Sequence, residues 1–271
     1  MIIDIHTHIF PDELAERAVA RLVENAGIPA HSDGTAAGLL ASMRRAGIAR
    51  AALMPVATKP SQVRTINAGA AELNRLYPEF IAFGTLHPAQ EDWAEEIARL
   101  VADGIPGIKL HHDYQQAFVD DARFLPIYQA LADAGLLLLV HAGVDIGLPP
   151  PVHCPPARLA GVLDAVTNLT VIAAHMGGYA CWDDVERYLI GRELYLDTSY
   201  SQTDLGAERM TAMIRAHGAE RILFGSDSPW TDQQAAVAGI RGLALSEREK
   251  EAILGGNAAR VLGIPQVREA V

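Results

Sequence analysis

The sequence has few cysteines and no long apolar run. Cys154 and Cys181 are the only cysteines among 271 residues, and no closely spaced pair suggests a zinc ribbon or a redox motif. Two isolated thiols fit a reducing compartment, so we expect a cytoplasmic protein. The most apolar stretch, Leu136 to Val140, is far too short to cross a bilayer, and Met1 leads directly into a strand-like run instead of a secretory leader. We therefore expect no membrane partner.

Basic residues are also scarce, and this excludes further classes of partner. The chain has 22 Lys and Arg against 33 Asp and Glu, which gives a net charge of −11. Nucleic acids and anionic lipids are bound through basic surfaces, so we expect neither as a partner. A deoxyribonuclease is disfavoured for the same reason, because phosphate backbones are contacted by Lys and Arg. The expected partner is a small-molecule substrate.

Short apolar runs alternate with amphipathic helical patterns along the whole chain. The strand candidates are residues 1–10, 49–58, 80–88, 107–114, 136–143, 170–178, 194–201 and 221–230. The helix candidates are residues 12–25, 61–76, 93–102, 124–134, 156–166, 182–190 and 207–217, followed by a helical stretch over 235–263 that Gly255 and Gly256 interrupt. Eight strand–helix repeats predict an α/β fold, a (β/α)₈ TIM barrel, as a single domain over residues 1–271. A doubly wound open sheet is the alternative, but it requires a glycine-rich turn after the first strand, and residues 6–11 form no such turn.

The first strand carries two histidines that are two residues apart. His6 and His8 therefore point to the same side of the strand, and we expect Ile3 and Ile5 to pack outward on the other side. Two neutral imidazoles at a strand end suit a divalent transition metal. Asp4 shares the parity of the histidines, so we expect it to orient a ligand imidazole or to form a buried hydrogen bond.

Further residues of the metal-ligand type follow the apolar runs of other strands. Lys109, His141, His175 and Asp227 each stand at the carboxyl end of a strand candidate. In a closed parallel barrel these ends meet around one axis, where barrel enzymes build their active sites. The residues are therefore expected to converge in space, and their types predict a metal centre.

With these motifs the chain resembles the amidohydrolase superfamily. The resemblance is to the amidohydrolase-2 branch, which includes metal-dependent hydrolases and aminocarboxymuconate-semialdehyde-type decarboxylases. It covers nearly the whole chain and rests on the segments DIHTH, GIKLH, VHAG, AHMGG, FGSDSPW and GGNAARVLG. It implies a barrel enzyme with its metal at the carboxyl ends of the strands.

The resemblance also implies a set of ligands. His6, His8, His141 and Asp227 would bind one divalent metal, for which zinc is the expectation. His175 would either bind a second metal or act as an acid–base and electrophilic group. In binuclear members of the superfamily a fourth-strand lysine is carbamylated and bridges two metals, whereas mononuclear members, decarboxylases among them, use no such lysine. Lys109 therefore leaves a second, carbamate-bridged metal open, the alternative being an ammonium group paired with Asp197.

We predict a metal-dependent hydrolase that uses metal-activated water on an amide, lactone or ester. A zinc ion lowers the pKa of bound water from about 15.7 to about 7. Asp227 is the predicted general base, and His175 is placed to stabilise the developing oxyanion. The alternatives are a non-oxidative decarboxylase of an aromatic or unsaturated acid, and a metal-binding protein without turnover. A decarboxylase is expected to clamp its substrate carboxylate with an inward arginine, and no strand end supplies one. Because relatives commonly dimerise, the resemblance also allows a homodimer.

Overall fold

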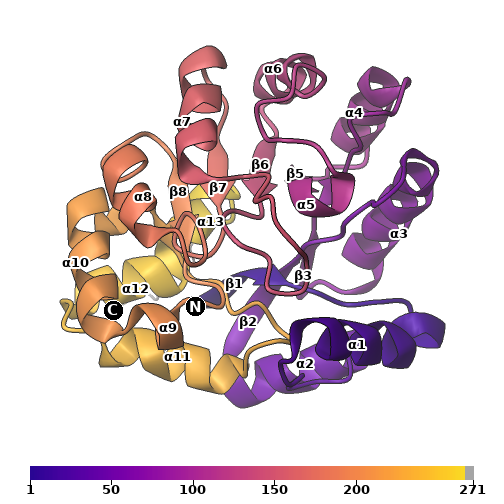
Figure 1. The fold of residues 1–271 in the computed structure, drawn as a ribbon. Helices are drawn as coiled ribbons and strands as arrows, with labels where there is room; N and C mark the ends of the chain where they lie inside the picture. The colour runs from indigo at the N-terminus through magenta and orange to yellow at the C-terminus, as the bar shows by residue number, and fades with distance from the viewer. Residues whose placement is uncertain (266–271) are drawn as a thin grey trace.

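The computed structural model describes residues 1–265, in which parallel strands form a closed barrel surrounded by helices (Figure 1). The strands are β1 Ile2–Thr7, β2 Ile48–Leu53, β3 Phe80–Ala82, β4 Gly84–Thr85, β5 Gly107–Leu110, β6 Leu137–Val140, β7 Val171–Ala173, β8 Tyr195–Asp197 and β9 Ile222–Leu223. Strands β3 and β4 are two parts of the third barrel strand, separated by Phe83. Each of the eight strand candidates of the sequence therefore contains a strand of the barrel.

Backbone hydrogen bonds close the barrel at both gaps between the two runs of paired strands. Strands β1 to β3 pair in parallel, and so do β4 to β9. Phe83 N donates to Leu53 O over 3.0 Å and joins the two runs on one side. Ile5 N donates to Phe224 O, and Asp227 N donates to His6 O, both over 2.8 Å. The predicted TIM barrel is confirmed.

The helices surround the barrel in chain order. They are α1 Asp12–Ala26, α2 Ala36–Ala46, α3 Val63–Leu76, α4 Trp93–Ala102, α5 His112–Gln115, α6 Leu125–Asp133, α7 Pro156–Ala165, α8 Trp182–Tyr188, α9 Gln202–Leu205, α10 Ala207–His217, α11 Gln233–Gly242, α12 Glu247–Glu251 and α13 Asn257–Val261. The predicted helices are present within a few residues, and α2, α5 and α9 are additional helices. The α-helix is interrupted at Gly255 and Gly256 as predicted, but the interruption is a π-helical turn, Ala252–Gly256, that joins α12 directly to α13. A glycine is needed there, since a Cβ atom at Gly255 would lie 2.1 Å from the carbonyl oxygen of Met1.

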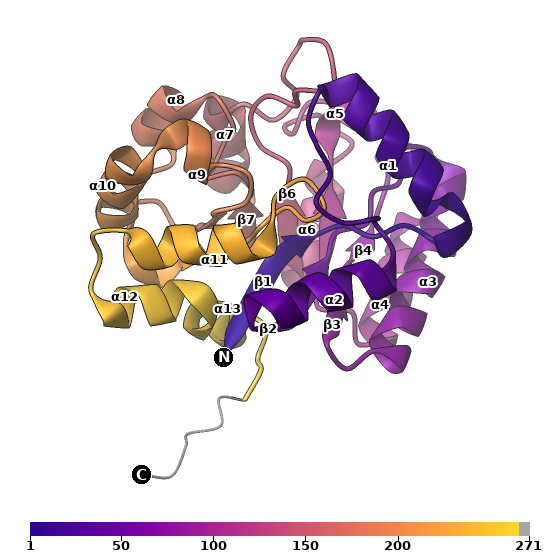
Figure 2. The same cartoon turned by 90° about the horizontal axis from the view of Figure 1, so that it is seen from below.

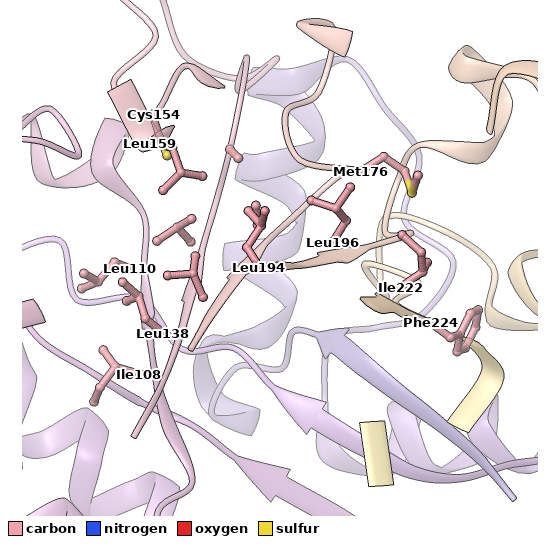
Figure 3. Close-up of a cluster of buried hydrophobic side chains, with 14 of the residues drawn as sticks. Ile108, Leu110, Leu138, Cys154, Leu159, Met176, Leu194, Leu196, Ile222 and Phe224 are labelled. Atoms are coloured by element: carbon pink, nitrogen blue, oxygen red, sulfur yellow. The ribbon is translucent and has the colours of Figure 1, made fainter. Parts of the chain in front are cut away.

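Two hydrophobic clusters fill the molecule. The larger one lies between the strands and the helices, and Figure 3 shows part of it, with Ile108 and Leu110 of β5 beside Leu138 of the neighbouring β6. The smaller one consists of alternate residues of most strands and of a few residues from α13 and the turn after it. Alternate residues of a strand face the same side, so this cluster fills the barrel interior. No helix within residues 1–265 is long and apolar enough to cross a membrane.

The side chains of β1 alternate differently from the prediction. Ile3 and Ile5 belong to the interior cluster, and Asp4 faces the helix layer, where Gln233 Nε2 of α11 donates to its Oδ2 over 2.8 Å. The expected outward packing of the two isoleucines is therefore wrong. The physical reason is an irregularity: the register of β1 against β2 shifts between Asp4 and Thr7, so strict alternation does not extend from Asp4 to His6.

Candidate metal centre

Three predicted ligands converge where β1 and β9 end. His6 Nε2 lies 3.5 Å and His8 Nε2 lies 3.2 Å from the same oxygen of Asp227, Oδ1. One ligand atom from each of the three residues lies within 4.8 Å of the other two. Asp227 has a left-handed backbone with φ of 67°, which is uncommon outside glycine and typical of functional sites. The structure thus brings residues 6, 8 and 227 together as the sequence predicted.

Asp197 at the end of β8 fixes the tautomer of His6. Its Oδ2 lies 2.8 Å from His6 Nδ1, and a carboxylate only accepts, so the imidazole carries its hydrogen on Nδ1. The pKa of His6 is lowered to about 4, mainly by burial and also by Lys109, so the ring is neutral. Burial raises the pKa of Asp197, but His6 and the hydrogen bonds outweigh this and lower it to about 2. His6 Nε2 therefore presents an unprotonated lone pair.

The sequence predicted that Asp4 orients a ligand imidazole or forms a buried hydrogen bond, and it suggested Asp197 only as a partner for Lys109. Asp4 instead accepts from the backbone N–H of His6 and from Ser226 and Gln233, and it contacts no imidazole. The signal for Asp197 was present, because it too ends an apolar strand run, LYLD, with a polar side chain.

The lone pair of His6 Nε2 faces an anionic oxygen, and this arrangement requires a cation. Burial raises the pKa of Asp227, but its histidine neighbours outweigh this and hold the pKa well below its usual range, so its carboxylate is ionised. Two electron-rich atoms 3.5 Å apart in a buried place repel each other unless a positive group lies beside them. Two imidazole nitrogens and one carboxylate oxygen are donors that a borderline-soft divalent ion accepts. The residues present therefore fit a metal ion.

Lys109 on β5 supplies a positive group in the same place. Its side chain is buried, and its Nζ lies 3.1 Å from His6 Nε2. Burial lowers the pKa of Lys109 to about 8, while Asp197 and Asp227 act in the opposite direction. The pairing of Lys109 with Asp197 that the sequence suggested is thus an electrostatic interaction within a cluster, in which the ammonium group contacts the unprotonated nitrogen of His6.

His141 and His175 form a second layer beside the three ligands. The His175 ring lies 5.4 Å from the His6 ring, centroid to centroid, and His175 Nε2 lies 3.0 Å from His141 Nδ1. His175 Nδ1 donates to the carbonyl of Ser199 over 3.0 Å, so its Nε2 accepts the hydrogen of His141 Nδ1. His141 Nε2 is then an unprotonated atom, buried and without a hydrogen-bond partner in residues 1–265. Such a nitrogen has a lone pair available for a positively charged group such as a metal ion.

A second group of donor atoms surrounds His141. One ligand atom each of His111, His141 and Asp145 lies within 4.8 Å of the other two, and His111 Nε2 lies 3.0 Å from Asp145 Oδ2. The two imidazole rings are stacked, however, with centroids 4.1 Å apart and an interplanar angle of 11°. An imidazole binds a metal in the plane of its ring, so two parallel rings at this separation cannot direct lone pairs to one ion. The group is therefore not a shared metal site in this arrangement.

Comparisons with known proteins agree with this architecture. The sequence model of the family described as Amidohydrolase matches residues 3–264. No curated protein sequence matches the chain. An uncharacterised TIM-barrel protein from Bordetella bronchiseptica superimposes with a TM-score of 0.77 and 22% identity, over 97% of this chain and 98% of that one.

Two decarboxylases are similar over the same extent. The 5-carboxyvanillate decarboxylase of Sphingomonas paucimobilis has a TM-score of 0.73 and 19% identity, over 97% of this chain and 99% of that one. A dihydroxybenzoic acid decarboxylase of a Polaromonas species, with bound manganese and the inhibitor 2-nitroresorcinol, has a TM-score of 0.74 and 19% identity, over 98% of each chain. At these identities the likeness establishes the fold.

Proposed function

The chain belongs to the amidohydrolase family, and from this premise we propose that it is a metal-dependent lyase that releases carbon dioxide from a small aromatic or unsaturated carboxylic acid. The observation that carries the proposal is the buried ammonium group of Lys109 beside His6 Nε2. The sequence favoured hydrolysis because no arginine stands at a strand end to hold a substrate carboxylate. Lys109 provides the missing positive charge. The two similar decarboxylases support the same choice.

The donor atoms described above support one set of metal ligands. His6, His8 and Asp227 would hold one divalent cation, and His141 would be the further donor, since its buried Nε2 has no partner in residues 1–265. When bound, the ion supplies positive charge that orients an anionic substrate and stabilises negative charge on its oxygens. Zinc fits these donors, and manganese, which the Polaromonas enzyme binds, is the second ion to test.

The side chains of Lys109, Asp227 and His175 have separate roles in the proposed reaction. The Lys109 ammonium group pairs with the substrate carboxylate and holds it in a place shielded from water. Asp227 is ionised, so it can accept a proton from an acidic hydroxyl of the substrate. It then passes this proton to the carbon that loses carbon dioxide, as the bond between that carbon and the carboxylate breaks. His175, with both ring nitrogens in hydrogen bonds, keeps His141 in place.

The test combines a substrate panel with isotope labelling. Hydroxylated aromatic and unsaturated acids are incubated with zinc- or manganese-loaded protein in deuterated water, and carbon dioxide is measured. We expect one deuterium at the carbon that carried the carboxylate. The Asp227→Asn variant should lose roughly 10²- to 10⁴-fold in rate, the usual range for a proton-transfer group. The control is Asp164→Asn on the exposed end of α7, which should keep its rate. Absence of carbon dioxide release across the panel would contradict the proposal.

Hydrolysis of an amide, lactone or ester remains the second candidate, and one observation favours it. Lys109 Nζ lies 3.1 Å from His6 Nε2, so a carbamate on Lys109 would lie beside the donor atoms of the site. His141 Nδ1 and His175 Nε2, 3.0 Å apart, could then both face a second ion instead of sharing a hydrogen. This candidate predicts two ions per chain, a carbamate signal of Lys109 in ¹³C NMR with labelled bicarbonate, and transfer of ¹⁸O from water to the product. One ion and an unmodified Lys109 would exclude it.

A further inference from the structure

Two histidine–aspartate pairs hold the two ends of the β6–α7 loop, residues 141–155. His111, directly after β5, lies with its Nε2 3.0 Å from Asp145 Oδ2 near the start of the loop. Asp113 accepts from both the backbone N and the Nδ1 of His153, each over 3.0 Å, near the end of the loop. The pairs are reciprocal, because each segment contributes one histidine and one aspartate. The loop is thus attached twice to the segment that follows β5.

The loop reaches elements on both sides of the barrel opening. Near its start, Val144 N donates to Tyr179 O over 2.9 Å, next to the bridge between Gly143 and Tyr179. Further along, Gly147 approaches the end of α1, where a Cβ atom on it would lie 3.7 Å from the Cβ of Ala26. Figure 2 shows the loop between β6 and α7 extending beside α5 and α1. The two histidine–aspartate pairs therefore hold the loop together with backbone hydrogen bonds at its two ends, among them Val119 N to His153 O over 2.9 Å.

Only one of the two pairs touches the candidate metal centre. The His111 ring lies flat against the ring of His141, with centroids 4.1 Å apart. The ring of His153 instead packs against Phe118, 4.9 Å away. Asp145 is fully engaged, since its Oδ1 accepts from Gly147 N over 2.8 Å and its Oδ2 contacts His111. Asp145 thus links the backbone of the loop to a ring that restricts the rotation of His141.

We propose that Asp145 is a positioning residue of the metal centre, which holds His111 flat against His141 and so couples the position of the β6–α7 loop to the orientation of a donor imidazole. When the loop is docked, His141 is confined by His111 on its face and by His175 at its Nδ1. When the loop moves away, Asp145 leaves with it and the His111 ring is released. The inference rests on the proposed function in one respect, that His141 is a donor of the metal centre.

The test compares Asp145→Ala with His153→Ala. Each variant removes one half of one pair and leaves the other pair intact, and only the first pair reaches His141. The affinity for Co²⁺ is measured by chelator competition, the visible absorption of the Co²⁺ protein is recorded, and hydrogen exchange reports loosening of residues 141–155. For Asp145→Ala we expect a loss of affinity of about 10- to 100-fold, the usual effect of removing a group that orients a ligand, together with a changed absorption band. His153→Ala should loosen the loop and leave both metal readouts unchanged.

The possible results separate the proposals. Equal Co²⁺ affinity and identical spectra for Asp145→Ala and the wild type would overturn the positioning role alone. An equal loss in both variants would also overturn it, since general loosening of the loop would then explain the effect. A wild-type protein that binds no divalent ion would overturn the proposed function and this inference with it. If Asp145→Ala does not fold, Asp145→Asn keeps the shape of the side chain without its charge. For this variant we expect a smaller loss of Co²⁺ affinity and a smaller change of the absorption band.

Discussion

Substitution of Asp197 by asparagine tests whether β8 controls the metal centre. In the structure one carboxylate oxygen lies 2.8 Å from His6 Nδ1, and the other accepts from the backbone N–H groups of His175 and Ser199, each over 3.0 Å. All of these groups are buried. An asparagine has nearly the same shape, but it offers one accepting oxygen and one donating NH₂ group. It can therefore satisfy only one side of this arrangement.

The hydrogen bonds decide which side is lost. If the NH₂ group faces the two backbone N–H groups, two buried donors lose their acceptor, at about 1–3 kcal/mol each and roughly 2–6 kcal/mol in total. If it faces His6 instead, the imidazole moves its hydrogen from Nδ1 to Nε2 and accepts at Nδ1. The second arrangement keeps the acceptor of both backbone N–H groups and turns the new Nε2 hydrogen towards Asp227 Oδ1, 3.5 Å away. It removes one contact, that of Lys109 Nζ with His6 Nε2, and we expect it to prevail. His6 Nε2 then has no lone pair for a metal, and the affinity should fall by about 10- to 100-fold.

Chelator competition with Zn²⁺ or Co²⁺ measures this effect, and circular dichroism shows whether the variant is folded. Asp4→Asn is the matched control. Asp4 is an equally buried carboxylate, but it bonds Ser226, Gln233 and a backbone N–H, and no imidazole nitrogen. We expect it to lose stability and to keep its metal affinity. Wild-type affinity in Asp197→Asn, or the same loss in both variants, would refute the tautomer argument.

Two further predictions concern stability. Gly143→Ala should lower the free energy of unfolding, measured by urea denaturation, more than Gly135→Ala does. Both glycines have a positive φ, which costs other residues about 1–2 kcal/mol. Only at Gly143 would a Cβ atom also collide with the backbone, because it would lie 2.3 Å from Tyr179 N. Equal losses would contradict the close approach. Burial lowers the pKa of His112 from 6.5 to about 3, so as the pH falls His112 is protonated in the unfolded chain before it is protonated in the folded one. The free energy of unfolding therefore decreases as the pH falls from about 6.5 towards 3, by up to about 1.4 kcal/mol per pH unit. His112→Gln should flatten this slope in urea unfolding at pH 6.5 and 4.5, and an unchanged slope would count against it.

Much of the barrel was predictable from the sequence because buried parallel strands read as continuous apolar runs. Each run ends at the barrel mouth, where a polar side chain such as His141 or Asp227 meets the site. Helix α2 was harder to foresee. Its start depends on Thr35, whose hydroxyl accepts from Gly38 N over 2.9 Å, and its first turn lies in an irregular, glycine-containing stretch over residues 27–38. Capping of this kind is a local hydrogen bond, which periodicity does not reveal.

The candidate site was predictable only where it followed from strand ends. Residues His6, His8 and Asp227 converge because neighbouring parallel strands bring their carboxyl ends together. The inward and outward sides of β1 were not predictable, since alternation assumes a regular strand and a register shift breaks it. The contact between His111 and Asp145 was also beyond the sequence. Asp145 lies in a proline-rich loop without periodicity, and only the folded position of that loop brings it to β5.

The end of β8 controls the protonation of the imidazoles in this site, although the sequence predicted no metal ligand there. Asp197 sets the hydrogen of His6 on Nδ1, and the carbonyl of Ser199 sets the hydrogen of His175 on Nδ1 and, through it, that of His141. The hydroxyl of Ser199 lies between the two branches, 3.1 Å from His6 Nδ1 and 3.0 Å from His175 Nδ1. Residues at and just after the end of β8 therefore determine which nitrogen of each of three imidazoles is unprotonated. Because a metal accepts only unprotonated nitrogen, residues 197–199 decide whether His6 and His141 can both bind the ion that we propose.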